Sequence, residues 1–402
     1  MKKIALLLSG GVDSSVALHM LCQAGEKPDC YYIHIGPDKD DTYSCTSDED
    51  IEMCKAVTKR YGVNFEIIDL HKEYWDQVVK YTMNVVAGGF TPNPDVMCNT
   101  LIKFGAFYDK IGYKYDYIAT GHYATRVGYM DLPNNKATVK FDDYDGHKRH
   151  WDDNIKWWIS PASDPVKDQV DFIANIDTSK IPISKILFPI GHLMKDEVRK
   201  IAEENHLINA KRKDSQGICF LGKINYNEYI EQHLGRKDGN IVDINTGNIL
   251  GTHHGHWFHT IGQRKGLGLS GGPWYVVGKN PDKNIVYVSN SQEDTTTNEF
   301  YVVKINWLTE NLIDTYLHRT TNDTKDSDEI CKVIFKVRHS PEKYYGIMKF
   351  CGNNNTIKII SNIPVTIAQG QFCILYDESY DVCFGCGAII GQSLSMYING
   401  II

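Results

Sequence analysis

Seven residues near the start of the chain, Ser9-Gly10-Gly11-Val12-Asp13-Ser14-Ser15, follow an apolar run typical of a strand and precede a segment with helical spacing. A loop in that position is suited to bind phosphate. Its glycines permit positive φ angles and close backbone approach, and the amides that open the helix point at the anion. Ser9 and Ser14 can add hydroxyl donors, and Asp13 can help to hold Mg²⁺. The alternative is a plain glycine turn with a serine cap.

This segment differs from the Walker pattern GxxxxGK[ST] and resembles the PP-loop of ATP pyrophosphatases, which cleave ATP between the α- and β-phosphates to adenylate a substrate. Two segments that contain cysteine, TPNPDVMCN (91–99) and DSQGICF (214–220), resemble the signatures of the tRNA-specific 2-thiouridylase family. The resemblance spans nearly the whole chain. It continues in order through ATGHYA (119–124), KDQ (167–169), FPIGHLMKDEVRKIAEE (188–204), HTIGQRKGLGLSGG (259–272) and AQGQFCILYD (368–377).

The resemblance implies that the wobble uridine of tRNA is converted into 2-thiouridine, with AMP and pyrophosphate as further products and Mg²⁺ as cofactor. The C2 carbonyl of uridine is a poor electrophile, so adenylation of its oxygen is needed before sulfur can replace it. A cysteine persulfide can supply the sulfur if a second thiol resolves the S–S bond. The family's roles imply that Cys219 carries the persulfide and that Cys98 releases its sulfur, leaving a transient Cys98–Cys219 disulfide.

Asp95 matches the candidate acid or base of the family. It precedes Cys98 by three residues, a spacing that places both side chains on one side if a helix begins there.

The same matching implies two sets of contacts. The target base must leave its stack to be reached. The partners implied are the anticodon stem-loop of tRNA and a sulfur donor such as a cysteine desulfurase or a sulfur-relay protein. The expected nucleotide-binding residues are Leu7, Leu8, Ser9, Gly10, Gly11, Val12, Asp13, Ser14, Ile33 and Gly121. The expected RNA-binding residues are Asn93, Pro94 and Asp95 around the base, with His122, Lys167, Asp168, Gln169, Arg338, His339 and Gln371.

Two other clusters have the residue types of metal sites. Cys383-Phe-Gly-Cys386 has zinc or redox spacing, but a single CxxC supplies only two of the four ligands of a structural zinc. The histidines at 253, 254, 256 and 259 fall in a segment that the resemblance covers as a strand and a turn. We therefore expect no metal site at either cluster.

Three departures from the family pattern bear on which RNA is bound. Ile33-His34-Ile35-Gly36 replaces a Met-Lys-Asn-Trp-like stretch, Val170-Asp171-Phe172 replaces Ser-Tyr-Phe after KDQ, and residues 131–160 are longer and more aromatic. Three alternatives stay open: a paralogue that thiolates a different RNA uridine, another PP-loop adenylating ligase, and a sulfur-carrier or RNA-binding paralogue without turnover. The ligase would not need Cys98 and Cys219.

Composition is that of a globular protein. The 402 residues are 42% hydrophobic and 23% charged, and no apolar run reaches the ~18 residues of a membrane span. With no signal-peptide pattern at the start, we expect a cytoplasmic protein whose eleven scattered cysteines are reduced. The net charge of −7 disfavours RNA binding in general. Basic clusters at 195–200, 211–213 and 264–265 can still form one basic face.

The elements that position these residues follow an α/β pattern. Apolar runs at 4–9, 30–35, 64–70 and 115–120 predict strands, and Ser14–Ala24 and Ile51–Tyr61 have helical spacing. This alternation predicts a Rossmann-like parallel sheet of the adenine nucleotide alpha hydrolase type. We expect a PP-loop domain at 1–210, a small, mostly-β central domain at 211–294 and a C-terminal β-barrel at 295–402. Segments 131–156 and 321–329 are interpreted as surface insertions.

Overall fold

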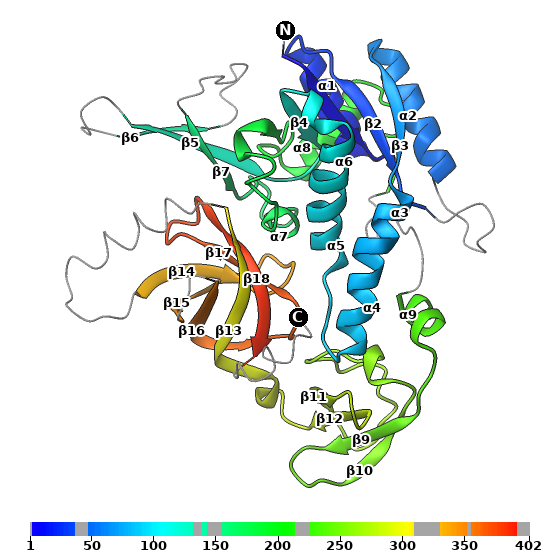
Figure 1. Cartoon of the computed structure of the whole chain (residues 1–402), viewed down its shortest axis with the longest axis vertical. Helices are drawn as coiled ribbons and strands as arrows, with labels where there is room; N and C mark the ends of the chain where they lie inside the picture. Colours follow the sequence, from blue (N-terminus) through cyan, green and yellow to red (C-terminus); the bar gives the residue numbers. More distant parts are fainter. Residues whose placement is uncertain are drawn as a thin grey trace.

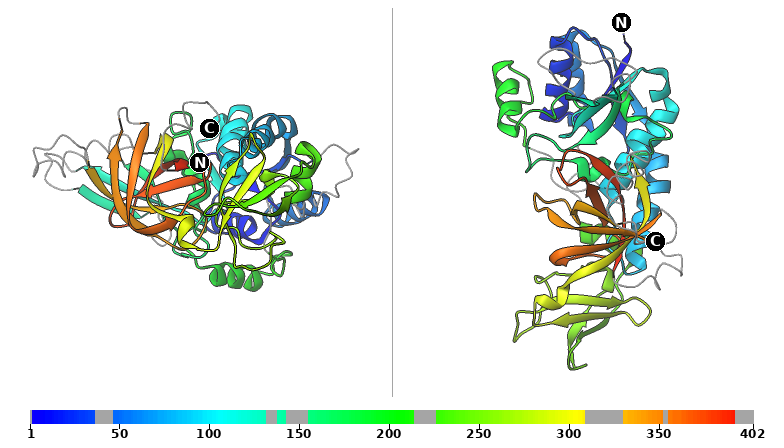
Figure 2. Two further views of the ribbon diagram at one scale, coloured as in Figure 1. Left: turned by 90° about the horizontal axis from the view of Figure 1, so that it is seen from below. Right: turned by 90° about the vertical axis from the view of Figure 1, so that its left-hand side faces the viewer.

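The computed structural model of the chain describes residues 2–36, 47–131, 138–142, 155–213, 226–308, 330–351 and 355–391. These residues form three parts (Figure 1): an N-terminal α/β part, a small β part near the middle of the sequence, and a C-terminal barrel. The right-hand view of Figure 2 shows that the α/β part and the small β part lie at opposite ends of the long axis.

A parallel sheet of five strands forms the centre of the N-terminal part, in the order β3-β2-β1-β4-β8. All neighbouring strands are parallel, which confirms the predicted α/β class. The strands are β1 (Ile4–Leu8), β2 (Asp29–His34), β3 (Phe65–Asp69), β4 (Tyr117–Thr120) and β8 (Ile186–Leu187). The first four match the predicted runs, with β2 beginning one residue earlier than its run; β8 is too short to give a pattern.

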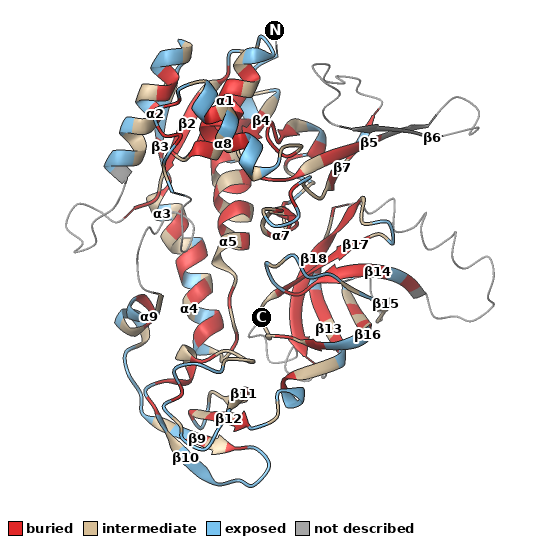
Figure 3. Ribbon diagram, turned by 180° about the vertical axis from the view of Figure 1, so that it is seen from behind, coloured by how far each residue is buried: buried red, intermediate tan, exposed pale blue. Residues whose placement is uncertain are grey.

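Strand β1 is buried on both faces, because its alternate side chains enter two different cores. Leu6 and Leu8 pack with α1 (Val12–Gln23), α2 (Ser47–Tyr61) and α8 (Lys195–Glu204). Ala5 and Leu7 instead face the helical segments between residues 71 and 110. The red strands and helix faces in Figure 3 mark these cores.

Two helical segments extend from the sheet towards the other two parts of the molecule (Figure 1). The first comprises α3 (His71–Tyr74), the π-helical η1 (Trp75–Val79) and α4 (Lys80–Ala87). The second returns through α5 (Pro94–Met97), the π-helical η2 (Cys98–Ala106), α6 (Phe107–Lys110) and the 3₁₀ turn η3 (Gly112–Lys114). The loop 88–93 between them lies far from the sheet.

Residues that we interpreted as a surface insertion include strand structure. An antiparallel sheet in the order β6-β5-β7 is formed by β5 (Thr125–Asp131), β6 (Thr138–Asp142) and β7 (Lys156–Ser160). Val127 of β5 and Trp158 of β7 belong to the apolar cluster of the barrel. This arm therefore packs against the C-terminal part. The short α7 (Val170–Ile173) and the 3₁₀ turn η4 (Ile183–Lys185) follow it in the chain.

The small β part is a mixed sheet in the order β10-β9-β12-β11, in which β9 and β12 are parallel. It is preceded by α9 (Tyr226–Leu234), whose Tyr229 ring packs edge-on against Trp75, with 6.4 Å between ring centroids. Its elements are β9 (Gly239–Asp243), β10 (Ile249–His253), η5 (His256–Phe258), β11 (Tyr275–Asn280), β12 (Ile285–Ser289) and η6 (Glu293–Thr295).

The C-terminal part is a closed antiparallel barrel, as predicted, in the order β13-β16-β15-β14-β17-β18. Closure leaves no free sheet edge. Its strands are β13 (Thr296–Trp307), β14 (Ile330–Lys336), β15 (Tyr344–Phe350), β16 (Thr356–Thr366), β17 (Phe372–Tyr376) and β18 (Cys383–Gly391). Of the helices in the described ranges, none has the length and apolar character to cross a membrane.

Candidate functional site

The expected nucleotide-binding residues lie where the strand order of the sheet reverses. Strand β1 pairs with β2 on one side and with β4 on the other, so the loops after β1 and β4 diverge. Ligands of open parallel sheets bind in the crevice outside the carboxyl ends at such a point. Leu7 and Leu8 end β1, buried Ile33 is near the end of β2, and Gly121 follows β4.

The loop Ser9–Gly11 turns sharply into α1. Gly10 has a φ of +73°, and a Cβ there would lie 2.7 Å from the carbonyl oxygen of Asp50, so glycine is required. Gly11 has a φ of −77° and an extended backbone, so of the two glycines only Gly10 uses the positive φ that this residue type permits. Extended backbone at the residue before a helix matches the usual N-cap conformation.

The start of α1 is open to an anion. No side chain caps this helix, and the first amides of a helix have no intrahelical partner. A Cβ on Gly121 would lie 2.7 Å from the backbone nitrogen of Ser14, so glycine keeps the space before these amides clear. The hydroxyl oxygens of the exposed Ser9 and of Ser14 lie 3.2 Å apart. These groups fit a nucleotide phosphate.

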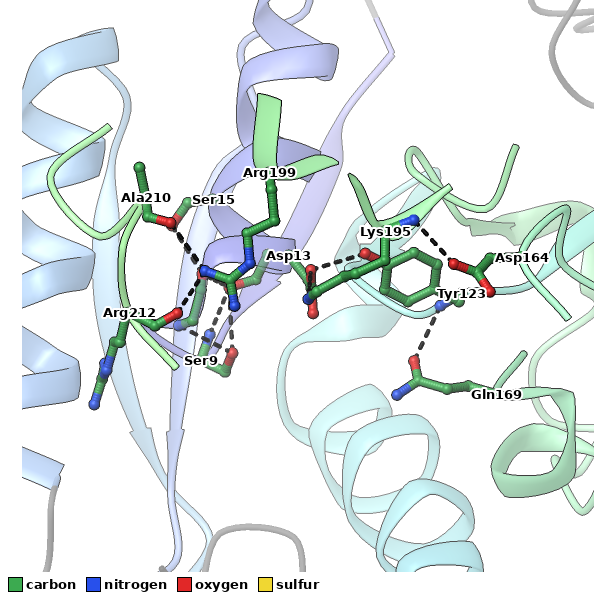
Figure 4. A network of polar contacts seen from close by, with 12 residues as sticks. Ser9, Asp13, Ser15, Tyr123, Asp164, Gln169, Lys195, Arg199, Ala210 and Arg212 are labelled. Carbon is green, nitrogen blue, oxygen red and sulfur yellow. Dashed lines mark hydrogen bonds and ion pairs between the residues drawn. The ribbon is translucent and has the colours of Figure 1, made fainter. Parts of the chain in front are cut away.

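Asp13 is the acidic group of this loop, and two side chains contact it (Figure 4). The Nζ of Lys195, from the first turn of α8, lies 2.7 Å from its Oδ1. The hydroxyl of Tyr123 donates to the same oxygen at 3.0 Å. The backbone nitrogen of Lys195 donates to Asp164 at 2.9 Å. The loops after β1 and β4 are thus joined to α8.

The outer side of the loop is held by residues 209–212. Asn209 donates to the carbonyl oxygen of Gly10 at 2.9 Å and to the hydroxyl of Ser15 at 2.8 Å. Arg212 donates to the same carbonyl at 3.1 Å and pairs with Asp50 at 2.5 Å. Arg199 of α8 in turn donates to the carbonyl of Arg212 (Figure 4). The loop is therefore fixed from the segment that precedes residues 214–225.

Asp95 and Cys98 lie in one continuous helical stretch, as their spacing predicted. Asn93 caps α5 by accepting from the amide of Val96 at 3.2 Å, and Pro94 takes the first helical position. Asp95 is half-buried, whereas Cys98 has 0% exposure and begins the π-helical η2. π-Helical turns are often found at functional sites. Cys219 lies outside the described residues.

His122 connects the nucleotide loops to the helix of Cys98. Its Nδ1 is hydrogen-bonded to the hydroxyl of Thr120 at 2.9 Å, and its Nε2 lies 3.5 Å from the Nζ of Lys103 in η2. Burial, together with the charge of Lys103, holds the pKa of His122 well below its usual range. Lys103 is five residues beyond Cys98 in the same π-helical segment.

The barrel holds the loop that precedes Cys98. Gln371 donates to the carbonyl oxygen of Pro92 at 2.7 Å and accepts from Asn93 at 3.4 Å. The amide of Thr91 donates to the carbonyl of Gln369 at 2.7 Å. Cys98 also shares one buried apolar cluster with barrel residues such as Phe372. Of the expected RNA-binding residues, Asn93 and Gln371 are thus brought into contact.

The KDQ segment is divided between the nucleotide loops and the barrel. Gln169 accepts from the amide of Tyr123 at 3.0 Å, beside the nucleotide site. Asp168 is only 2% exposed, and its carboxylate lies 3.6 Å from the buried Lys336 of β14. Burial raises the pKa of Asp168. This placement puts the Asp168 side chain in the junction of the barrel and the KDQ segment, whereas Lys167 and Gln169 are partly exposed.

Arg338 and His339 follow β14 at the surface. Arg338 pairs with Glu342 at 3.1 Å, both side chains being more than half exposed. The ring of His339 stacks on Phe172, with centroids 4.5 Å apart, and lies 3.3 Å from a carboxylate oxygen of Asp171. These two residues therefore lie next to the junction of the barrel and the KDQ segment.

The other clusters are accounted for by packing. Cys383 and Cys386 are fully buried in β18, where burial raises the pKa of both thiols. His253 and His256 bond to Asn284, both at 3.2 Å. Within the described ranges, no three His, Cys, Asp or Glu side chains are grouped so as to hold a metal.

Sequence reasoning missed the residues that surround the loop from distant segments. They are Asp50, Tyr123, Lys195, Asn209 and Arg212. Lys336, at the junction of the barrel and the KDQ segment, was missed as well. Their signals in the sequence were weak: Lys195 and Tyr123 fall in motifs, and Lys195 and Arg212 in basic clusters.

Comparison with known proteins covers almost the entire chain. Residues 2–223, 227–290 and 297–389 match, in turn, the families described as tRNA methyl transferase HUP domain, tRNA methyl transferase PRC-barrel domain and Aminomethyltransferase beta-barrel domain.

Curated relatives are named for thiolation and not for methyl transfer. The tRNA-specific 2-thiouridylase MnmA of Porphyromonas gingivalis is 47% identical over 390 residues, which cover 96% of this chain and 98% of that protein. MnmA of Parabacteroides distasonis is 47% identical over 97% of this chain and 99% of its own length. MnmA 1 of Bacteroides thetaiotaomicron is 46% identical, with 96% and 99% coverage. The chain therefore belongs to the tRNA-specific 2-thiouridylase family.

Proposed function

We propose that this protein converts the wobble uridine of tRNA into 2-thiouridine, with cleavage of ATP to AMP and pyrophosphate. The observation that carries the proposal is the joining of an anion-binding loop to the helix of Cys98. His122, one residue beyond Gly121, contacts Lys103 in that helix. This contact supports a mechanism in which the activation step and the sulfur-transfer step take place in neighbouring parts of the protein.

The nucleotide is held by the loop after β1 and by Gly121. The amides that open α1 and the hydroxyls of Ser9 and Ser14 bind phosphate oxygens, and Asp13 offers a carboxylate to Mg²⁺. The backbone near Ile33 borders the adenosine. ATP supplies the adenylyl group that makes the uridine C2 oxygen a leaving group.

The target base lies at Asn93, Pro94 and Asp95, at the start of the helix of Cys98. Asp95 acts as acid or base, since it precedes Cys98 by one helical turn. A persulfide on Cys219 delivers sulfur, Cys98 resolves the S–S bond, and a Cys98–Cys219 disulfide remains until it is reduced. The sulfur donor is a cysteine desulfurase or a relay protein of the cytoplasm.

RNA contacts come from exposed or half-exposed groups near the start of the helix of Cys98. Lys167, Arg338 and His339 flank the junction of the barrel with the catalytic part, and His122 and Gln169 border the nucleotide loops. Gln371 contributes by holding residues 92 and 93. The Asp168 side chain is left out of this interface, because it is 2% exposed.

The spent nucleotide tests the activation step. Wild-type protein incubated with tRNA, ATP, Mg²⁺ and a sulfur donor should yield AMP and pyrophosphate on anion-exchange chromatography. Asp13→Ala should suppress both, because it removes the carboxylate that holds Mg²⁺ at the loop. Formation of ADP would show that the bond between the α- and β-phosphates is not the one cleaved, and would overturn the assignment. Mapping the thiolated position in the RNA distinguishes wobble uridine from another uridine.

A further inference from the structure

The phosphate loop contains no cation of its own. Ser9–Ser15 includes no lysine or arginine, whereas a Walker loop has a lysine that binds the phosphates. Attack of the uridine oxygen forms a bond to the α-phosphorus and breaks the bond to the bridging oxygen. Pyrophosphate departs with that electron pair. Positive groups placed at the departing charge stabilise such a transition state.

Lys195 is placed to supply this charge from outside the loop. It occupies the first turn of the ten-residue α8, and its Nζ lies 2.7 Å from Oδ1 of Asp13. Its side chain is 13% exposed and that of Asp13 is 32% exposed, so the pair lies at the mouth of the site. Tyr123 confines the ammonium, whose nitrogen is 5.6 Å from the ring centroid.

The two arginines near the loop have other tasks. Arg212 donates to the carbonyl of Gly10 and pairs with Asp50. Arg199 donates to the carbonyls of Ala210 and Arg212. Both act on the backbone behind the loop, whereas Lys195 contacts a side chain of the loop that faces the opening of α1 (Figure 4).

We propose that Lys195 is the phosphate-binding cation of this site, held at the loop by Asp13 until Mg²⁺ and ATP bind. Asp13 would then hold Mg²⁺ through its carboxylate, and the Lys195 ammonium, released from Asp13, would bind oxygens of the β- and γ-phosphates. The exchange keeps both charges paired at each stage. This inference rests on the proposed function and adds to it the residue that neutralises the leaving pyrophosphate.

The test compares AMP, ATP and pyrophosphate binding to the full-length protein by calorimetry, with and without Mg²⁺. Lys195→Met should weaken ATP and pyrophosphate binding by about tenfold or more, the scale of a hydrogen bond to a charged group. The affinity for AMP should change by less than about threefold, because AMP lacks the phosphates that Lys195 binds. Lys195→Arg should restore part of the loss. Lys200→Met, on the same helix in an exposed pair with Glu204, is the matched control.

A second variant separates phosphate binding from a structural role. Asp13→Asn removes the partner of Lys195 and leaves the ammonium in place, so pyrophosphate binding without Mg²⁺ should be kept or strengthened. Equal loss of AMP and ATP in Lys195→Met, no loss at all, or equal loss of metal-free pyrophosphate in both variants would overturn the inference. If wild-type protein binds no ATP, the proposed function itself fails. If wild type binds and cleaves ATP and Lys195→Met matches it, only this inference fails.

Discussion

Gln371 of the barrel donates its side-chain amide to the carbonyl oxygen of Pro92, at 2.7 Å, across 279 residues of sequence. Its Oε1 accepts from Asn93, the residue that caps the helix of Cys98. Both ends of this side chain are thus bound to the loop that leads to Cys98. The barrel therefore positions the catalytic helix, besides any contact that it makes with RNA.

Replacing Gln371 should lower turnover more than RNA affinity. Gln371→Leu removes three hydrogen bonds, to the carbonyls of Thr91 and Pro92 and from Asn93, worth about 1.5–4.5 kcal/mol together, and loosens residues 91–93. We expect kcat for thiolation to fall several-fold with little change in the Kd for tRNA. Gln371→Glu keeps an acceptor for Asn93 but loses the donor to Pro92, and should be intermediate. A large loss of tRNA affinity with unchanged kcat would instead make Gln371 an RNA contact alone.

Removing a phosphate contact should reduce the salt dependence of tRNA binding. Arg338 is exposed and paired only weakly by Glu342, so it can turn to a phosphate. Arg338→Ala and Lys167→Ala should each lower the log–log slope of affinity against salt by about 1. Lys55→Ala, in a similarly exposed pair on α2, is the control. Filter binding at several salt concentrations measures this, and slopes equal to the control would exclude both residues from the interface.

Loss of Lys336 should destabilise the junction of the barrel and the catalytic part. Its Nζ lies 2.8 Å from Asp171, and both side chains are 2% exposed. Lys336→Met leaves two buried carboxylates without their cation, a change that costs about 3–5 kcal/mol. Chemical denaturation should show this loss, and adding Asp171→Asn should restore part of it. Equal stability of wild type and Lys336→Met would contradict the account; Lys358→Met, at a partly exposed barrel pair, is the control.

Acid should weaken the small β part through His259. Burial, with smaller effects of His253 and Lys279, lowers its pKa from 6.5 to about 4. Between pH 6.5 and 4, His259 is therefore protonated in the unfolded chain and neutral in the folded chain. Stability is unaffected above pH 6.5 and falls as the pH drops towards 4, by about 3 kcal/mol in total. His259→Gln should flatten this part of the pH profile in denaturant titrations.

The control for this titration is His254→Gln, which removes an exposed imidazole from the same segment. A wild-type profile that stays level between pH 6.5 and 4 would contradict the buried, neutral state of His259.

Local patterns in the sequence predicted the parts of the site that are local in the chain. The strand before Ser9 and the helix after it follow from an apolar run and its helical continuation. The three-residue spacing of Asp95 and Cys98 places both side chains on one side of a helix that begins there, and α5 does begin at Pro94. The sequence did not reveal which of Gly10 and Gly11 has a positive φ, because both are glycines and either one can adopt it.

Long-range pairs could not be predicted in the same way. Asp13 and Lys195 are 182 residues apart, and Lys336 meets Asp171 only because the barrel docks on the KDQ segment. Neither pair has a period or a spacing in the sequence. The π-helical geometry at Cys98 also lacks a sequence pattern, because it depends on how the helix packs.

The central claim is that two thiols deliver sulfur to an activated tRNA uridine. Nucleoside mass spectrometry of tRNA incubated with the protein, ATP, Mg²⁺, a reductant and a cysteine desulfurase with labelled sulfur tests it most directly. Wild type should form labelled 2-thiouridine over repeated cycles. Cys219→Ser should accept no label, and Cys98→Ser should carry label at Cys219 without repeated turnover. Thiolation by Cys98→Ser at the wild-type rate over many cycles would contradict the account.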